Sequence, residues 1–411
     1  MPGPGMDIIG KEEKEALLEV IESGYLYRYG DLQNPKFKAK VWNLEQNFAK
    51  YTNTKYALAV NSGTSALLTA LWALKIGPGD EVIVPGYTFI ASITSIIFAR
   101  AIPILVEVDD TLTLDPKDVR NKITPRTKAI MLVHMLGNPG HLEEITKIAE
   151  EHNLILIEDC AQAFGATFHG KSVGTYGKIG AFSLNVYKTI TAGDGGMVIT
   201  NDEELYKRAF AIHDQGHLPL RQGVEQGNRT VLGLNFRMNE LTAAVAGAQL
   251  NKINYIKKTL QNNKNHLKFF LSEIKEIKFR RILDVEGDIG TLLTFFMPTI
   301  ESAEILSEKL NCTTIAKSGW HVYNNMEHFL NQSTVTDEGC PFKCPYYGGN
   351  SIKYDKGMLP HTDELLKRAI NISVGVSDVG LGSNYGIRIN SSEEEIKIKG
   401  QKIVDLIKES L

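Results

Sequence analysis

Between residues 56 and 200, short apolar runs rich in β-branched side chains alternate with amphipathic stretches. The stretches 66–74 and 141–152 carry apolar residues at helical spacing. Apolar runs separated by helices in this way are typical of a sheet covered by helices. The sequence therefore predicts an α/β fold with a mostly parallel central sheet flanked by helices. The apolar runs are YALAV at 56–60, EVIVP at 81–85, PILVEV at 103–108, AIMLVHM at 129–135, LILIED at 154–159 and GMVIT at 196–200.

The composition and pattern of the sequence change near residue 251. A Lys/Asn-rich amphipathic helix follows, then scattered strands, an irregular segment rich in Cys, Pro, Tyr and Gly at 339–350, and a closing amphipathic helix. Because no low-complexity linker marks the change, the boundary is soft. The sequence predicts a large domain over 1–250 and a smaller C-terminal α+β domain over 251–411.

Charge and hydropathy exclude several classes of protein. A formal net charge of -3 gives no electrostatic basis for binding nucleic acid. No segment approaches the roughly 20 apolar residues of a membrane-spanning helix, and the first residues lack the order of a signal peptide. We therefore expect a cytoplasmic protein.

The cysteines do not suggest a metal or disulfide framework. The chain has four cysteines, and only Cys340 and Cys344 are close together, in CPFKC. A zinc knuckle has a gap of about two residues and a second ligand pair, neither of which is present here. We expect a structural loop and no metal.

Three motifs follow predicted strands, at the sheet edge where ligands bind in folds of this kind. The first, NSGTS at 61–65, opens a helix, so its backbone N–H groups and the side chains of Thr64 and Ser65 suit a phosphate. Serine and threonine are also ordinary helix caps, so this motif alone is equally consistent with a structural turn.

The second motif ends a strand on Asp159. A carboxylate at the end of a buried strand needs a cationic partner, and a pyridinium nitrogen is one candidate. A turn-capping aspartate is the alternative. The third motif places Lys188 between a strand and the glycine-rich return TAGDGG. Partial burial there would lower the lysine pKa and favour Schiff-base chemistry.

Together these segments resemble the DegT/StrS family of sugar aminotransferases, also written DegT/DnrJ/EryC1/StrS, among the fold-type I enzymes that use pyridoxal phosphate. The resemblance extends over nearly the whole chain, and motifs of this length in the same order are specific. It rests on KEEKEALLEVIESG, GDEVIVPGYTFIAS, ITPRTKAIMLVHMLG, IEDCAQAFGA, FSLNVYKTITAGDGG and LGLNFRMNELTAA.

The resemblance implies roles for individual residues. Lys188 would bind the cofactor covalently and move a proton, and Asp159 would pair with the pyridine nitrogen. Gln162 matches the residue that approaches the 3′-oxygen, and Phe89 matches the aromatic residue that stacks on the ring. As plain sequence, Phe89 is equally a core aromatic residue after a strand.

The phosphate and the second subunit are the other implied contacts. Ser183 and the turn formed by Gly63, Thr64 and Ser65 match the phosphate site. Asn235 matches a residue that reaches the phosphate from a partner subunit, which implies a homodimer with shared sites. Without the family, Asn235 is a polar loop residue before a helix.

The resemblance also suggests the reaction. Related sugar dehydratases carry histidine where this chain has Lys188, so lysine favours transamination from L-glutamate or glutamine to a ketosugar. A catalytically idle sensor of the cofactor or sugar is the alternative from another class. The presence of Lys188, Asp159 and Gln162 counts against it.

Features outside these motifs bear on the substrate. The segments GYLYRYG at 24–30, DQGH at 214–217 and WHVYNN at 320–325, with MPG at the start, are most similar to the branch that aminates an eight-carbon octulosonate of lipopolysaccharide at C8. A nucleotide-linked ketohexose is the alternative substrate. The candidate substrate residues are Arg28, His217, His321 and Asn324, although an ion pair or a structural hydrogen bond is the commoner role for such side chains.

Overall fold

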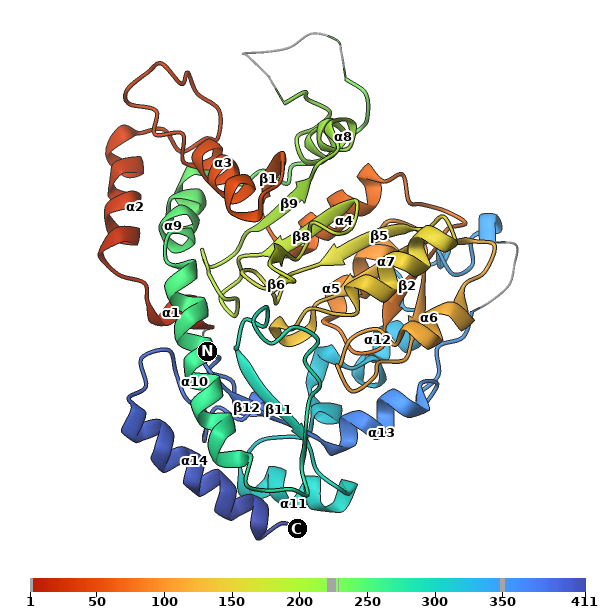
Figure 1. The fold of residues 1–411 in the computed structure, drawn as a ribbon. Coiled ribbons are helices and arrows are strands. Elements are labelled where there is room, and N and C mark those ends of the chain that lie inside the picture. Colours follow the sequence, from red (N-terminus) through yellow and green to blue (C-terminus); the bar gives the residue numbers. More distant parts are fainter. Residues whose placement is uncertain (1–2, 220–226, 228, 348–351) are drawn as a thin grey trace.

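The computed structural model describes residues 3–219, 227, 229–347 and 352–411 of the chain. Met1, Pro2 and the end of the irregular segment, 348–350, lie outside the described residues. The centre of the molecule is a seven-stranded sheet with strand order β1-β9-β8-β5-β4-β2-β3 (Figure 1). Its strands are β1 (Tyr56–Val60), β2 (Glu81–Pro85), β3 (Ile102–Val106), β4 (Thr127–Val133), β5 (Ile155–Asp159), β8 (Ile179–Ser183) and β9 (Gly196–Thr200).

Strand β9 is the one antiparallel member of this sheet. It pairs antiparallel with both β1 and β8, whereas β8, β5, β4, β2 and β3 pair parallel in turn. Each apolar run predicted from the sequence forms a strand, and the mostly parallel central sheet is confirmed.

Two layers of helices cover the two faces of the sheet. Alternate side chains of each strand point to opposite faces, so in β1 Ala57 belongs to one apolar cluster and Leu58 to the other. Helices α4 (Gly63–Ala73), α5 (Ile90–Phe98) and α8 (Glu203–His213) contribute to the cluster of Leu58. The cluster of Ala57 receives α3 (Lys40–Thr52), α6 (Pro116–Lys122), α7 (Leu142–Glu151), α9 (Glu240–Leu250) and α10 (Ile253–Leu271).

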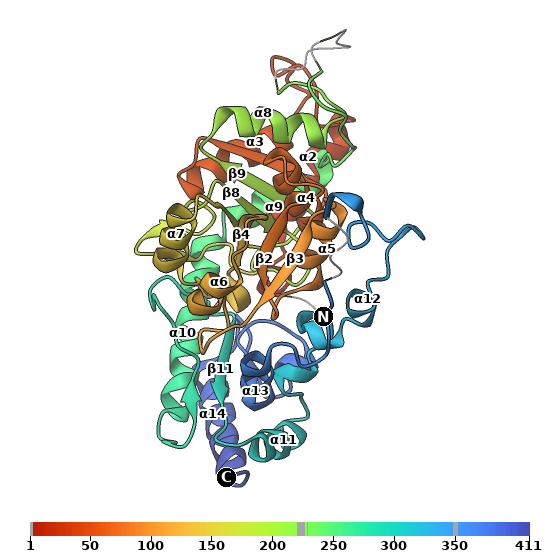
Figure 2. The same ribbon diagram turned by 90° about the vertical axis from the view of Figure 1, so that its right-hand side faces the viewer.

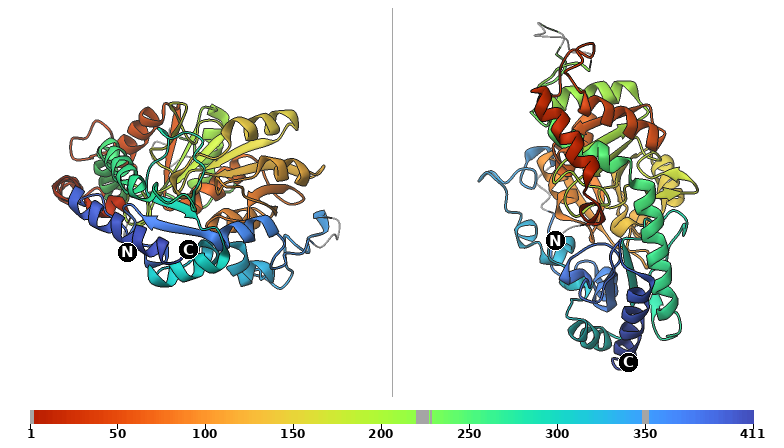
Figure 3. Two further views of the ribbon diagram at one scale, coloured as in Figure 1. Left: turned by 60° about the horizontal axis from the view of Figure 1, so that its bottom comes forward. Right: turned by 90° about the vertical axis from the view of Figure 1, so that its left-hand side faces the viewer.

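A second, three-stranded antiparallel sheet follows in the chain, with order β10-β11-β12. The long helix α10 packs against the last helix along this end of the molecule (Figure 3). The elements are β10 (Lys278–Phe279), β11 (Leu292–Phe296), α11 (Ile300–Lys309), α12 (Glu327–Leu330), α13 (Pro360–Arg368), β12 (Ala369–Ser373) and α14 (Glu393–Lys408).

The predicted boundary near residue 250 stays a prediction. The apolar cluster of Ala57 continues through α10 into the small sheet and α14. Residues 315–347 and 352–366 also contribute to the cluster of Leu58 beside the large sheet. There the Tyr347 hydroxyl donates to Glu81 at 2.6 Å and the Tyr354 hydroxyl donates to the carbonyl of Pro103 at 2.8 Å.

The remaining elements lie near the N-terminus and on a surface hairpin. Helix α2 packs against α9 on the side of the large sheet (Figure 1). In the described part of the chain, no helix is both long enough and apolar enough to span a membrane. The elements are α1 (Pro4–Asp7), α2 (Lys11–Ser23), β6 (Thr167–Phe168) and β7 (Lys171–Ser172).

Candidate active site

Lys188 lies in the turn that directly follows β8. The turn is closed by bonds from the Lys188 N–H to the Asn185 carbonyl at 2.9 Å and from the Ala192 N–H to the Leu184 carbonyl at 3.0 Å. Burial lowers the pKa of the Lys188 amine, and the nearby Asp159 carboxylate offsets this effect only in part. A lysine with a lowered pKa has more of the neutral amine that attacks a carbonyl carbon.

The N-terminal segment packs against this turn. The Gly3 N–H donates to the Val186 carbonyl at 2.8 Å. A Cβ on Gly3 would lie 2.3 Å from the Tyr187 carbonyl oxygen, and one on Gly5 would lie 2.9 Å from the Thr191 nitrogen. Only glycine can approach the lysine turn this closely. The predicted site did not include these glycines, although the pattern PGPG at 2–5 is a signal for such a close approach.

Asp159 ends β5, next to the lysine turn. In the register of β5 with β8, Asp159 is opposite Ala181, so the carboxyl ends of these strands meet at one edge. The carboxylate is 4% exposed and accepts bonds from the Ser92 hydroxyl at 2.7 Å and the Ala161 N–H at 3.0 Å. The second bond is the turn cap that the sequence offered as an alternative.

The buried carboxylate of Asp159 still needs a cationic partner. Burial raises the pKa of Asp159, although its hydrogen bonds and the charge of Lys188 oppose that effect. Among the residues that the structure describes, Asp159 has no ion pair within 4.0 Å. A protonated pyridine nitrogen would therefore fit the chemistry of this carboxylate.

Phe89 and His321 form one wall beside the lysine. Phe89 caps the start of α5 and is 36% exposed, and its ring centroid lies 6.0 Å from the Lys188 Nζ. The His321 ring lies 5.3 Å from the Phe89 ring, and its carbonyl accepts from the Thr88 N–H at 2.9 Å. Burial and the charge of Lys188 lower the pKa of His321 to about 4, so this histidine is neutral at pH 7.

Gly63 and Ser183 meet at the same edge. A Cβ on Gly63 would lie 2.7 Å from the Ser183 Cβ, so glycine is required for this close approach. Ser62 caps α4 by accepting from the Ser65 N–H at 3.0 Å, and the Ser65 hydroxyl donates to Asn61 at 2.7 Å. The Ser65 hydroxyl is thus used within the turn, whereas Thr64 is exposed. The open N-terminus of α4 suits an anion.

Gln162 comes three residues after Asp159. Its side-chain carbonyl accepts from the Leu136 N–H at 2.9 Å. This bond holds the side chain and leaves the NH₂ group as the donor for a ligand oxygen, as the predicted role requires.

Two predicted substrate residues lie elsewhere. Arg28 is 7% exposed, and its guanidinium donates to Glu45 at 2.9 Å and to His213 Nε2 at 2.9 Å. Asn324 donates to Asp363 at 2.7 Å and accepts from the Gly357 N–H at 3.0 Å. Both side chains are already occupied by the protein, so their positions argue against substrate contact. Of the four candidates, the structure brings only His321 beside Lys188.

Asn235 and His217 lie on the segment that extends past α8. Asn235 is exposed and pairs with Asp214 in an isolated bridge. His217 Nε2 is 3.0 Å from a guanidinium nitrogen of Arg229. The described residues of this segment, 214–219 and 229–239, lie at the same end of the molecule as the loop after α2 (Figure 2), and there the Tyr29 hydroxyl donates to Asp214 at 2.5 Å. The role of Asn235 toward a partner subunit stays a prediction.

Among the described residues, two groups of side chains could in principle bind a metal. His134, Glu158 and Cys160 are buried together. Glu158 accepts from His134 Nε2 at 3.0 Å and from the N–H groups of Gly174, Tyr176 and Gly177 at 2.6, 2.7 and 2.7 Å. This carboxylate therefore fixes the loop before β8. Cys340 and Cys344 carry free thiols.

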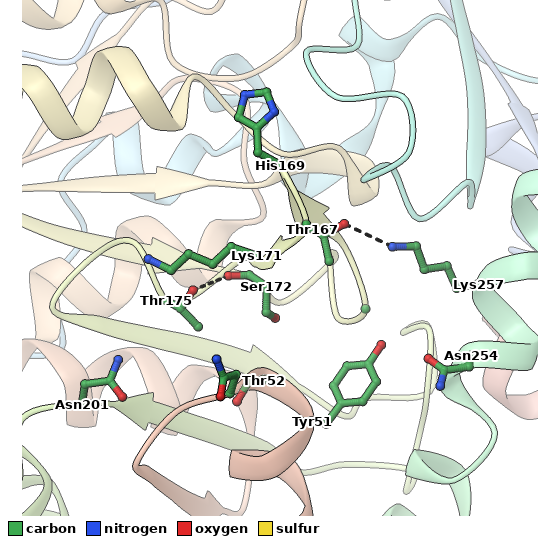
Figure 4. Close-up of a pocket in the computed structure, with 13 residues that line it drawn as sticks. Tyr51, Thr52, Thr167, His169, Lys171, Ser172, Thr175, Asn201, Asn254 and Lys257 are labelled. Carbon is green, nitrogen blue, oxygen red and sulfur yellow. Dashed lines mark hydrogen bonds between the residues drawn. The ribbon is translucent and has the colours of Figure 1, made fainter.

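A cavity of about 590 Å³ lies away from this site (Figure 4). Asn201, which lines it, follows β9, and the Thr200 hydroxyl beside it donates to the Lys178 carbonyl just before β8 at 2.8 Å. The cavity is therefore at the opposite edge of the sheet from Lys188.

A family model matches residues 7–377 of this chain, and it describes the DegT/DnrJ/EryC1/StrS aminotransferase family. GDP-perosamine synthase of Escherichia coli O157:H7 is 43% identical over 242 residues, covering 59% of this chain and 63% of that enzyme. The dTDP-3-amino-3,6-dideoxy-alpha-D-galactopyranose transaminase of Aneurinibacillus thermoaerophilus is 39% identical over 296 residues, covering 72% of this chain and 76% of that enzyme.

Solved structures are similar over the whole fold. An aminotransferase from Psychrobacter cryohalolentis has a TM-score of 0.78 at 27% identity and covers 100% of this chain and 99% of its own. The 3-amino-5-hydroxybenzoic acid synthase structure has a TM-score of 0.76 at 27% identity, covering 98% and 97%. The expected fold-type I architecture is confirmed.

Proposed function

Because the chain belongs to the DegT/DnrJ/EryC1/StrS aminotransferase family, we propose that it uses pyridoxal phosphate to transfer an amino group from L-glutamate or glutamine to a nucleotide-linked ketosugar. The observation that carries the proposal is that Lys188, whose pKa is lowered by burial, lies at the same sheet edge as the buried carboxylate of Asp159. The matched part of the Escherichia coli relative is 63% of its length, so the substrate class is itself part of the proposal.

Each residue of the site would have a separate role in binding the cofactor or in moving the proton. Pyridoxal phosphate supplies an aldehyde that takes up the amine and a ring that accepts electrons. Lys188 would hold the cofactor and move the proton at the Cα of the donor. Asp159 would bind the ring nitrogen, Phe89 would cover one face of the ring, and Ser183 with the Gly63 turn would bind the phosphate.

The choice of sugar rests on the relatives. Both curated relatives described above are named for nucleotide-linked sugars. The octulosonate suggested by the sequence has support only from the segments around 24–30, 214–217 and 320–325, two of whose candidate residues, Arg28 and Asn324, have structural partners. We therefore place the nucleotide-linked ketosugar first and the octulosonate second.

The first test follows the two halves of the reaction. We expect L-glutamate or L-glutamine to shift the visible absorption band of the purified protein, because amino transfer would change the chemical form of the cofactor that Lys188 holds. The aminated protein should then regain its original band with a nucleotide-linked keto-hexose and not with a free octulosonate aldehyde. A band that neither donor shifts would contradict amino transfer, and recovery only with the octulosonate would reverse the choice of sugar.

We propose in addition that two chains share each site, with Asn235 reaching the phosphate of the partner subunit. The end of the molecule that carries Asn235 also exposes large apolar side chains. Leu26, Tyr27 and Leu234 are 49%, 47% and 49% exposed, and Tyr27 lies under the guanidinium of Arg237. Apolar groups exposed together in this way are typical of an interface between chains.

Subunit complementation tests the shared site. Lys188→Ala and Asn235→Asp should each inactivate their own homodimer, the second by placing a negative charge next to the phosphate. In a mixed dimer one of the two sites has neither change, so co-expression should restore about a quarter of the wild-type activity. Activity that stays at the sum of the two parents would show that the site belongs to one chain.

A further inference from the structure

A chain of two hydroxyl groups lies behind the Asp159 carboxylate. The Ser92 hydroxyl, on the first turn of α5, donates to Asp159 Oδ2 at 2.7 Å. The Thr88 Oγ1 lies 2.7 Å from the Ser92 Oγ. Thr88 is 0% exposed and Ser92 is 1% exposed, so both hydroxyl groups are shielded from bulk solvent.

The direction of the bonds follows from the number of protons. A carboxylate is acceptor-only when ionised, so the single Ser92 proton goes to Asp159. The Ser92 oxygen is then free to accept the proton of Thr88. The other acceptor near Thr88, the Phe89 carbonyl, is at 3.5 Å and is too far to compete. The order is therefore Thr88 to Ser92 to Asp159.

This arrangement connects two walls of the site. Phe89 lies between Thr88 and Ser92, and the Ser92 N–H donates to its carbonyl at 3.0 Å. One turn of chain thus places both the exposed aromatic ring and the donor that holds the carboxylate. Because burial favours the neutral acid at Asp159, a donor to its ionised form has a large effect on the charge of this group.

We propose that Ser92, supported by Thr88, is a positioning residue that holds Asp159 ionised and oriented toward the pyridine nitrogen of the cofactor. The inference rests on the proposed function. Ser92 acts through Asp159 and does not touch the substrate. Without it, Asp159 would take up a proton more readily and would hold the ring nitrogen less well.

The same helix contains a matched control. Ser95 is also 1% exposed, and its hydroxyl donates to the Ser92 carbonyl at 3.0 Å. Ser95→Ala removes one buried hydroxyl from α5, as Ser92→Ala does, but leaves the Asp159 carboxylate untouched.

The experiment compares three variants of the holoenzyme with the wild type. In Ser92→Ala, kcat for amino transfer from L-glutamate should fall about 10- to 100-fold, the cost of a hydrogen bond to a charged group, with KM changed little. The ¹⁵N shift of pyridoxal phosphate labelled at the ring nitrogen should move toward the unprotonated form. Thr88→Val, which keeps the shape, should give a smaller change in the same direction, whereas Ser95→Ala should match the wild type.

Two results would overturn the inference. One is a ¹⁵N shift and a kcat in Ser92→Ala or Thr88→Val that equal those of the wild type. The other is an equal loss in Ser95→Ala, which would indicate a general effect on helix packing. If Ser92→Ala does not fold, Thr88→Val gives the same readouts. The response of the wild type to L-glutamate tests the proposed function separately.

Discussion

Replacing Lys188 with alanine should reduce amino transfer by at least about 10⁴-fold, because one side chain both holds the cofactor and moves the proton. The fold should survive this change. Burial lowers the pKa of the lysine, which means that the folded state disfavours its charged form. Removing the amine therefore eliminates an unfavourable burial, and the melting temperature of the cofactor-free protein should not fall.

Stopped-flow absorbance with L-glutamate measures the loss, and circular dichroism measures the melting temperature. Lys171→Ala is a matched control, because the Lys171 amine lies 4.1 Å from the centroid of the Tyr176 ring and lines the cavity at the opposite edge of the sheet. That variant should keep wild-type kinetics. A Lys188→Ala variant that still transfers the amino group at a normal rate would refute the assignment.

Local sequence was enough to predict that Asp159, Phe89 and Lys188 would lie at one edge of the sheet, whereas their roles there stay predictions. Asp159 ends a predicted strand, Phe89 follows another, and Lys188 follows a third; parallel strands bring their carboxyl ends to one edge. The six predicted runs all form strands, and β2 and β9 among them are buried throughout. Strand β8, which precedes Lys188 and is also buried throughout, was not among those runs.

Loop residues could not be placed in the same way, because their partners are distant in the sequence. Arg28 binds Glu45 and His213, and Asn324 binds Asp363. No local sequence pattern predicts these pairs. The role of Gly3 was not predicted either, since it depends on contact with the lysine turn, which is distant in the sequence. An unusual side chain in a loop suggested contact with a substrate, whereas the structure gives it a hydrogen-bond partner within the protein.

The Arg28 and Glu45 pair provides the second large effect, on stability. Glu45 is 2% exposed and accepts from Arg28 at 2.9 Å and from the Ala59 N–H at 2.8 Å. Arg28→Met would leave this carboxylate buried without a cation. We expect the free energy of unfolding to fall by about 3–5 kcal/mol, as for other broken buried pairs.

Changing Glu45 as well separates the loss of the interaction from the cost of an unpaired buried charge. Glu45→Gln combined with Arg28→Met removes both charges, so this double variant should be more stable than Arg28→Met alone, although the amide will not recover every bond. Urea denaturation at one fixed protein concentration measures the wild type and both variants, since an oligomer's stability depends on concentration.

The same series decides between the two roles suggested for Arg28. If the guanidinium bound the sugar, Arg28→Met would raise KM for the sugar and leave the unfolding free energy unchanged. If Arg28 instead forms a buried ion pair with Glu45, Arg28→Met should lower the unfolding free energy and leave KM for the sugar unchanged. Arg28 also donates a hydrogen bond to His213. Burial and the nearby guanidinium lower the pKa of His213 to about 3. His213 ends α8 just before Asp214. Loss of Arg28 should therefore loosen the segment that carries Asn235, so any change in activity should appear together with the loss of stability.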